Sequence, residues 1–90
     1  MKRIHLVISG VVHGVGFRYN ARRKARLMNL TGYSRNLDNG SVEIEVQGTT
    51  DALERFIQWV HHGPPDAKVE LVEQKEINVV INESDFEIRD

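Results

Sequence analysis

The feature of this sequence that most constrains its fold is a pair of predicted strands that meet at a tight turn. A segment with helical spacing lies on each side of this pair. The turn is Asn39-Gly40, the dipeptide most typical of a two-residue β-hairpin. Residues 41–47 then alternate strictly between polar and apolar side chains, which predicts a strand with one buried face. The predicted core face of this strand carries Val42, Ile44 and Val46, and its predicted solvent face carries Glu43, Glu45 and Gln47.

The segments before the hairpin predict a buried strand followed by a basic helix. Residues 3–12 are rich in β-branched and large aliphatic side chains and have no polar helical face, which favours a central strand. Residues 17–28 return to helical spacing after a glycine-rich interruption, and residues 33–37 are again extended. The apolar stripe of the predicted helix comprises Phe17, Ala21, Ala25 and Met28, and its other faces carry Arg22, Arg23, Lys24 and Arg26.

A second amphipathic helix and two further strands are predicted after the hairpin. Asp51-Ala52-Leu53-Glu54 fits a capping box, and Gly63-Pro64-Pro65 is typical of a helix end. Residues 67–73 predict a strand, with an extension through Ile77 and Val79 left open, and Phe86 with Ile88 indicates a short closing strand. The apolar positions of the helix are Leu53, Phe56, Ile57 and Val60, and Trp59 is expected at the edge of the core.

The element order βαββαβ predicts an α+β fold, the ferredoxin-like split βαβ sandwich. Right-handed crossovers place strands one and three in the centre of an antiparallel sheet of order 4-1-3-2, with two helices on one face. A length of ninety residues predicts a single domain, residues 1–90. This architecture serves enzymes, RNA-binding proteins and regulatory modules alike, so the function has to come from a site.

The net charge of −1 conceals a strong asymmetry along the chain. Residues 1–37 hold eight of the twelve basic residues and no acid, whereas residues 38–90 hold four basic residues and all thirteen acids. This asymmetry suggests a basic region that binds an anion. The alternative is a solvated charge dipole whose halves interleave on folding.

Two absences narrow the classes of protein. The chain has no cysteine, which excludes disulfides, thiolate zinc sites and a thiol nucleophile. Met1-Lys2-Arg3 and the apolar residues after it faintly resemble a signal peptide, but His5 interrupts them and no small-residue cleavage site follows. No apolar run approaches the ~18 residues that a membrane span needs, so the expectation is a cytoplasmic protein without a membrane partner.

The glycine-rich segment 10–18 lies between the first strand and the first helix, where unsatisfied N–H groups and the helix dipole favour a bound oxyanion. Glycines permit the backbone conformations of an anion nest, and Arg18 adds a planar fork suited to two phosphate oxygens. The segment is not a Walker A loop, since no Gly-Lys-Ser/Thr follows, nor a Rossmann fingerprint, since Tyr19 stands at the third glycine. The alternative is an ordinary strand-to-helix connection.

A second polar cluster, residues 32–40, contains Arg35 and Asn36 side by side in a strand pattern. Two-fold alternation sends only one of them outward. An amide turned toward the protein needs a partner or a role. The alternatives are an asparagine satisfied in the core and an asparagine in a functional site.

Together these segments resemble the acylphosphatases. The matching residues are Gly-x-Val-x-Gly-Val-x-Phe-Arg at 10–18 and Gly-Tyr-Ser-Arg-Asn-x-x-x-Gly-x-Val at 32–42, with Gly48 six residues beyond. The resemblance extends over essentially the whole chain, including Gly63-Pro64 and Phe86-x-Ile88-Arg89, and it implies the same split βαβ sandwich. Three positions depart from the family pattern: His13, Ser34 and Asp90. These departures bear on the hydrogen bonding of the loop and on the docking of the C-terminal tail.

The resemblance implies hydrolysis of a carboxyl–phosphate mixed anhydride to a carboxylate and inorganic phosphate, without a metal or an organic cofactor. Arg18 matches the phosphate-binding arginine and Asn36 the asparagine that orients the attacking water. The matching phosphate cradle is formed by His13, Gly14, Val15, Gly16 and Phe17. The expected partners are a small acyl phosphate and inorganic phosphate, the latter as product and competitive inhibitor, and the expected state is a monomer.

The chemistry of the residues agrees with that expectation. A carboxylate with a conjugate-acid pKa of about 4–5 leaves without a general acid, and phosphoryl transfer asks mainly for positioning and charge stabilisation. One alternative is a phosphate-ligand module without turnover, and another is an RNA-binding module of the same fold, which would need exposed aromatics where strand 41–47 carries Glu43 and Glu45.

Two further clusters favour simple surface roles. His61-His62 is not read as a metal pair, because adjacent helical residues point in different directions and histidine suits a helix C-terminus. The basic residues of segment 22–26 favour a solvated face that could steer anionic substrates over a nucleic-acid patch.

Overall fold

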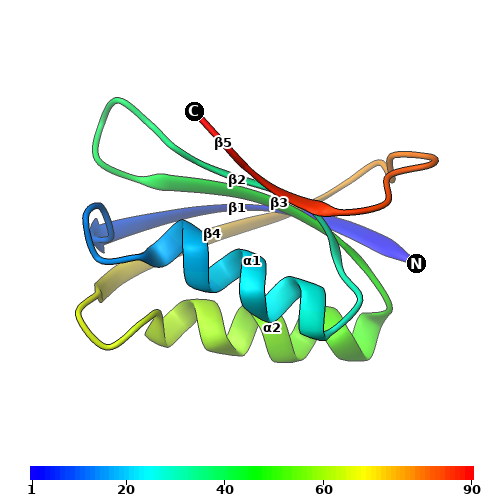
Figure 1. Cartoon of the computed structure of the whole chain (residues 1–90), viewed down its shortest axis with the longest axis horizontal. Helices are drawn as coiled ribbons and strands as arrows, with labels where there is room; N and C mark the ends of the chain where they lie inside the picture. The colour runs from blue at the N-terminus through cyan, green and yellow to red at the C-terminus, as the bar shows by residue number, and fades with distance from the viewer.

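A twisted five-stranded sheet carries both helices on one of its faces (Figure 1). The computed structural model describes all residues from 1 to 90. Its elements in chain order are β1 (Lys2–Val11), α1 (Phe17–Leu27), β2 (Thr31–Asn36), β3 (Val42–Gly48), α2 (Thr50–His62), β4 (Lys68–Ile77) and β5 (Phe86–Arg89).

The predicted order of the first four strands is confirmed, and β5 extends the sheet to β4-β1-β3-β2-β5. Neighbours among the first four strands are antiparallel, as expected. β5 instead lies parallel to β2, with Gly32 opposite Phe86, so the whole sheet is mixed. The extension of β4 through Ile77 is observed, whereas Val79 lies beyond the strand.

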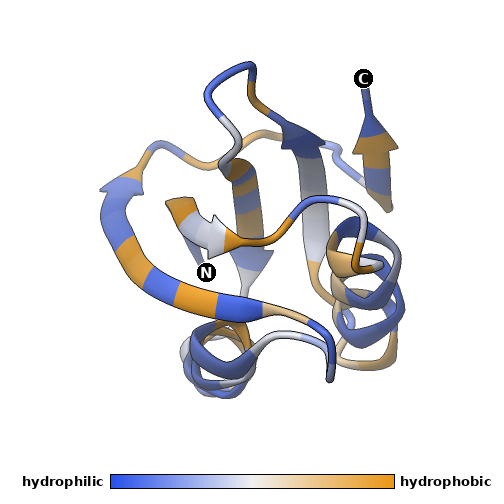
Figure 2. Ribbon diagram, turned by 90° about the vertical axis from the view of Figure 1, so that its left-hand side faces the viewer, coloured by the Kyte–Doolittle hydropathy of each residue, from blue (hydrophilic) through white to orange (hydrophobic).

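The core lies between the sheet and the two helices, as Figure 2 shows in a view turned by 90°. Val42, Ile44 and Val46 are fully buried, which confirms the predicted core face of β3. Burial of each such side chain stabilises the fold by roughly 1.5–3 kcal/mol. The predicted helical stripes are confirmed by the buried Phe17, Ala21 and Ala25 of α1 and the buried Leu53, Phe56 and Val60 of α2, with Met28, Ile57 and Trp59 partly buried against the core.

The start of α2 corrects the predicted capping box. The N-cap is Thr49, whose side chain accepts a hydrogen bond from the Ala52 N–H at 3.3 Å, and Asp51 lies within the first turn. A threonine two residues earlier competes successfully because its hydroxyl reaches an unsatisfied first-turn N–H. Gly63 ends the helix with φ 69°, as predicted. Neither helix is long and apolar enough to cross a membrane.

The sheet face opposite the helices is less open to solvent than the alternation predicts. Gln47 is only 4% exposed because the segment between β4 and β5 crosses this face on its way to the edge beside β2. The Gln47 amide donates to the Val80 carbonyl and accepts from the Val80 N–H, both at 2.8 Å. The prediction that Gln47 faces solvent was therefore wrong, because a segment distant in sequence covers it.

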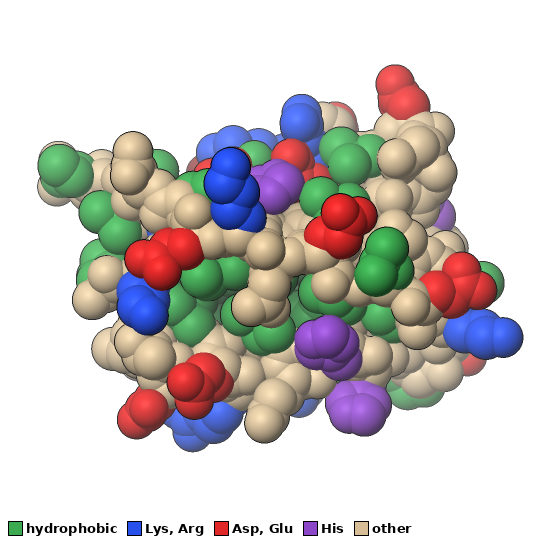
Figure 3. Space-filling model, turned by 180° about the vertical axis from the view of Figure 1, so that it is seen from behind, with side chains coloured by type: hydrophobic (Ala, Val, Ile, Leu, Met, Phe, Trp, Pro, Cys, Tyr) green, Lys and Arg blue, Asp and Glu red, His purple; other side chains and the backbone are tan.

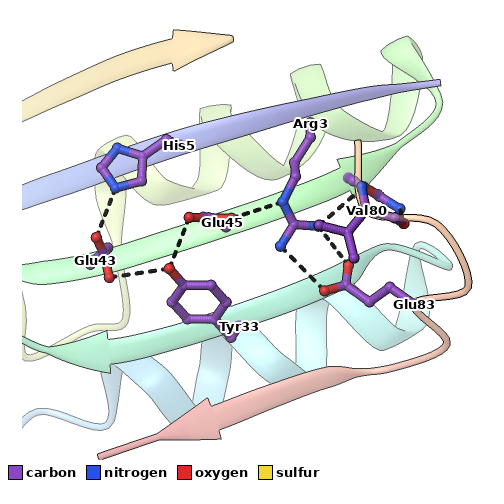
Figure 4. A network of polar contacts seen from close by, with 8 residues as sticks. Arg3, His5, Tyr33, Glu43, Glu45, Val80 and Glu83 are labelled. Carbon is purple, nitrogen blue, oxygen red and sulfur yellow. Dashed lines mark hydrogen bonds and ion pairs between the residues drawn. The ribbon is translucent and has the colours of Figure 1, made fainter. Parts of the chain in front are cut away.

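A polar network fills the space under this crossing segment (Figure 4). Arg3, 2% exposed, donates to Glu45 at 2.9 Å and to Glu83 at 2.7 Å and 3.2 Å. The Tyr33 hydroxyl shares its single proton between a carboxylate oxygen of Glu45 at 2.9 Å and one of Glu43 at 3.3 Å. Burial and these two carboxylates raise the pKa of Tyr33, so the hydroxyl stays protonated at neutral pH. Each buried charge in the network therefore has a partner.

Candidate active site

The connection from β1 to α1 leaves a row of backbone donors without partners. Gly14 and Gly16 adopt left-handed φ angles of 70° and 76°, a conformation that glycine reaches without the strain a side chain would add. Gly16 is the N-cap of α1, and no side chain caps this end. None of the hydrogen bonds outside the helices and strands has a donor among the backbone N–H groups of residues 14–18. The positive end of the helix dipole adds to these free donors, so the turn favours an anion.

The carbonyl side of the same turn is held in place. Both the backbone N–H and the side-chain amide of Asn20 donate to the Gly16 carbonyl, at 3.0 Å and 2.8 Å. This pair anchors the glycine turn to the first turn of the helix. The N–H groups are thereby held in one orientation before any ligand arrives, which reduces the free-energy cost of binding.

A pocket of about 140 Å³ opens at this helix end, and five of the seven predicted site residues line it. A water occupies about 30 Å³ of liquid, so the pocket has room for a tetrahedral oxyanion and a water. Its walls come from three separate parts of the chain: the glycine turn with α1, the end of β2, and β5. The lining residues are Val12, Gly14, Gly16, Phe17, Arg18, Tyr19, Asn36 and Ile88.

The other two predicted residues, His13 and Val15, lie beside the pocket. Nε2 of His13 donates to the Ser41 carbonyl at 2.7 Å, which places the ring proton on Nε2 and ties the turn to the start of β3. Val15 is partly buried against the core. Their side chains therefore hold the turn in shape, and only their backbone N–H groups are available to a ligand.

Arg18 reaches the pocket as an unpaired cation. Its Nη1 donates to the carbonyl oxygen of Arg89 at 3.3 Å, and no carboxylate forms an ion pair with it. The Arg89 guanidinium lies over the Tyr33 ring, 4.1 Å from its centroid, a distance suited to a cation–π contact. A guanidinium that is held by a neutral carbonyl keeps its full charge for an anion.

Asn36 and Arg35 diverge at the end of β2, as two-fold alternation predicts. Asn36 is half-buried and lines the pocket, whereas Arg35 is exposed and pairs with Glu43 on the opposite face of the sheet. None of the side-chain hydrogen bonds in the structure involves Asn36, so both ends of its amide are free. A free amide at a pocket wall is suited to holding a water.

Ser34, two residues before Asn36, is fully buried, and its hydroxyl has no hydrogen-bond partner. It lies opposite Ile44 of β3 and Ile88 of β5 in the sheet. A buried hydroxyl without a partner costs about 1–3 kcal/mol. Nothing in the structure explains why this strand carries serine here.

The two oppositely charged halves of the sequence interleave on folding. Arg3, Arg26 and Arg35 of the basic half each pair with a carboxylate of the acidic half. The hydrogen bond from Arg26 lowers the pKa of Asp85. Burial acts to raise the pKa of Glu43, but hydrogen bonds from His5 and Arg35 outweigh it and lower that pKa. The predicted basic region therefore shrinks to Arg18 and its neighbours on α1.

The remaining sequence candidates lie away from the pocket. His61 and His62 are exposed in the last turn of α2, and no group of three His, Cys, Asp or Glu side chains has the arrangement of a metal site. Figure 3 shows acidic and basic side chains interspersed over the side seen from behind, with no patch of one sign. β2 places one aromatic, Tyr33, on the sheet face opposite the helices, but Arg89 covers its ring.

Three of the lining residues were not predicted as site residues: Val12, Tyr19 and Ile88. Arg89, whose carbonyl holds Arg18, was not predicted either. Tyr19 follows Arg18 directly, so its position at a helix start was the available signal. For Ile88 and Arg89 the signal was weaker, a four-residue strand pattern at the end of the chain. Their place beside α1 depends on the pairing of β5 with β2.

Comparison with known proteins gives one consistent answer. The family model Acylphosphatase matches residues 4–88. An acylphosphatase of Salinibacter ruber is 51% identical over 72 residues, which cover 80% of this chain and 76% of the relative, and one of Chlorobaculum tepidum is 39% identical over 97% of this chain and 95% of the relative. The crystal structure of acylphosphatase from Bacillus subtilis superposes with a TM-score of 0.94 at 34% identity and covers 99% of both chains. With sequence, fold and nearly full length in agreement, this chain belongs to the acylphosphatase family.

Proposed function

We propose that the protein hydrolyses acyl phosphates at the pocket between α1, β2 and β5, and releases a carboxylate and inorganic phosphate. The observation that carries this proposal is the convergence of Arg18 and Asn36 on one pocket at an uncapped helix N-terminus. Family membership supports the reaction class. The roles of the individual residues are inferred from the geometry and from the match to the family motifs.

The phosphoryl group is held by the first turn of α1. Backbone N–H groups of residues 14–18 donate to its oxygens, and the two parallel N–H groups of the Arg18 guanidinium bind it in fork geometry. These donors are fixed before the reaction begins, so they stabilise the charge on the equatorial oxygens in the transition state at little reorganisation cost.

Asn36 orients the attacking water from the wall of the pocket. Its amide oxygen accepts a hydrogen bond from the water and directs a lone pair at phosphorus, in line with the bond to the acyl oxygen. The new bond joins water oxygen to phosphorus, and the bond between phosphorus and the acyl oxygen breaks. The electron pair leaves with the carboxylate, and the proton of the water passes to a phosphate oxygen.

This mechanism assigns no step to a metal ion or an organic cofactor. The leaving carboxylate needs no protonation, because its conjugate acid has a pKa of about 4–5. All the groups in the mechanism come from this chain, so the proposed reaction requires no residue of a second copy. Inorganic phosphate, as product, fits the same donors and is expected to compete with the substrate.

The test of the proposed function is the release of phosphate from benzoyl phosphate by the purified protein, with and without EDTA. Hydrolysis that EDTA leaves unchanged supports the proposal, and activity abolished by EDTA contradicts the metal-free mechanism. Inorganic phosphate should inhibit competitively and shift the NMR signals of the amides from Gly14 to Arg18. Phosphate binding at these amides without turnover would favour a non-catalytic phosphate-binding module.

A further inference from the structure

A second hollow adjoins the pocket along the exposed side of α1. It measures about 260 Å³, and three of its five lining residues are arginines. Tyr19, 57% exposed, lines both hollows, so the two lie next to each other on α1. We call this hollow the arginine groove; its lining residues are Tyr19, Arg22, Arg23, Arg26 and Leu27.

The charges of the arginine groove are only partly compensated. Arg26 is bound to Asp85 by two hydrogen bonds, at 2.9 Å and 2.8 Å. Arg22 and Arg23 form no ion pair or side-chain hydrogen bond, although the charge of Arg22 contributes slightly to the lowered pKa of Asp85. Three cations thus share one carboxylate, and the groove keeps a positive potential.

Arg22 leans toward the pocket. Its guanidinium carbon lies 5.7 Å from the centroid of the Tyr19 ring, one turn nearer the helix start. Helical side chains point toward the N-terminus, so Arg22 and Arg18, four residues apart, are neighbours on one face with about 5–6 Å between their Cβ atoms. An anion next to Arg22 and a phosphoryl group at Arg18 would therefore be separated by the span of a small acyl group.

We propose that the arginine groove is a subsite for a second anionic group on the acyl part of the substrate. The phosphoryl group occupies the pocket, the acyl chain leaves it over the Tyr19 ring, and a carboxylate or phosphate at its far end meets Arg22. The preferred substrates are then acyl phosphates whose acyl group is itself an anion. This inference rests on the proposed function, and it adds the class of acyl group.

The test compares two substrates that differ only in one charge: 3-carboxybenzoyl phosphate and its amide isostere, 3-carbamoylbenzoyl phosphate. The ratio of their kcat/KM values, carboxylate over amide, isolates the contribution of the groove, because both have the same reacting centre and nearly the same shape. We expect a ratio of about five at low ionic strength, as for an exposed ion pair, and a decrease in high salt.

Arg22→Gln should bring the ratio close to one, and Arg22→Glu should reduce it below one. Lys24→Gln is the matched control, because Lys24 is an exposed cation of the same helix that does not line the arginine groove. The change in the ratio that Lys24→Gln causes should be less than about half of the change that Arg22→Gln causes. Equal effects of Arg22→Gln and Lys24→Gln, or an unchanged ratio in Arg22→Gln, would overturn the subsite. Hydrolysis of the amide substrate separately tests the proposed function, since it does not involve the second anion.

Discussion

The main-chain carbonyl of Arg89 accepts a hydrogen bond from the Arg18 guanidinium at 3.3 Å, although 71 residues separate them in the sequence. The contact exists because β5 pairs with β2 at the edge of the sheet next to α1. It holds the Arg18 side chain without neutralising it. A neutral acceptor suits the phosphate-binding role that we propose for Arg18, because a carboxylate in its place would compete with the substrate.

Replacing Arg18 by Gln should lower kcat by about 10²–10³, the loss typical for removing one donor to a developing negative charge. The measurement is steady-state hydrolysis of benzoyl phosphate. Arg18→Lys keeps the charge but loses the fork, so it should restore only part of the activity. Full turnover in Arg18→Gln would remove this residue from the proposed site.

Asn36→Ala should also lower kcat by about 10²–10³, because the attacking water loses its orienting group. Phosphate binding is expected to persist, since Arg18 and the N–H groups of the turn remain. The two effects are separated by measuring kcat together with the inhibition constant of inorganic phosphate. A variant that turns over normally, or that loses phosphate affinity instead, would contradict the assigned role.

Gly14→Ala and Gly40→Ala form a matched pair. Both glycines have positive φ angles, 70° and 91°, and in both an added Cβ meets no atom within 4 Å. Each alanine should therefore destabilise the fold by about 1–2 kcal/mol through backbone strain alone. Only Gly14 lines the pocket, so only Gly14→Ala should also weaken phosphate binding. Equal phosphate affinity in the two variants would show that the turn does not bind the anion.

Ser34→Ala should stabilise the protein by about 1 kcal/mol, since it removes a buried hydroxyl that has no partner. Urea unfolding measures the effect as a higher midpoint at an unchanged slope. A lower midpoint would mean that the hydroxyl has a partner in solution, such as a bound water.

Acid should destabilise the fold through Glu43. Hydrogen bonds from His5 and Arg35 keep the pKa of this carboxyl below its ordinary value of 4.5, despite the opposing effect of burial. Because the pKa is lowered in the folded state, the ionised carboxylate stabilises the fold at pH values above its ordinary pKa. This stability is lost as the pH falls below about 4.5. The free energy of unfolding between pH 6 and pH 3 should therefore depend less steeply on pH in Glu43→Gln than in the parent. The control is Glu54→Gln, which changes an exposed glutamate that forms no ion pair. Equal dependence of the free energy of unfolding on pH in the parent and in Glu43→Gln would contradict this role of Glu43.

Local patterns were sufficient for most of the fold. The alternation in β3 and the stripes of the helices identify the buried faces correctly, because burial of a regular element repeats with its own period. They were insufficient where a distant segment intervenes. Gln47 is buried by a segment that begins some thirty residues later. The predicted N-cap of α2, Asp51, was wrong for a local reason, because the Thr49 hydroxyl reaches the free N–H instead.

The candidate site also has a part that local sequence predicts and a part that depends on tertiary contacts. The motifs around Arg18 and Asn36 are local, and both residues line the pocket. His13 and Val15 carry side chains that point to other partners, which spacing along a turn does not determine. Ile88 and the Arg89 carbonyl joined the site only through the packing of α1 against β5.

The sequence by itself determined the order of elements, the faces that form the core and the glycine turn that leaves N–H groups free, because each follows from interactions within a few residues. Tertiary structure alone decided that β5 lies parallel to β2, which carboxylates neutralise the basic half of the chain, and that Arg22 remains uncompensated beside the pocket. Most of these outcomes depend on contacts between segments far apart in the chain. The position of β5 and the ion pairs of Arg3 with Glu83 and of Arg26 with Asp85 follow from the path of residues 78–85 across the sheet, and no local period predicts that path.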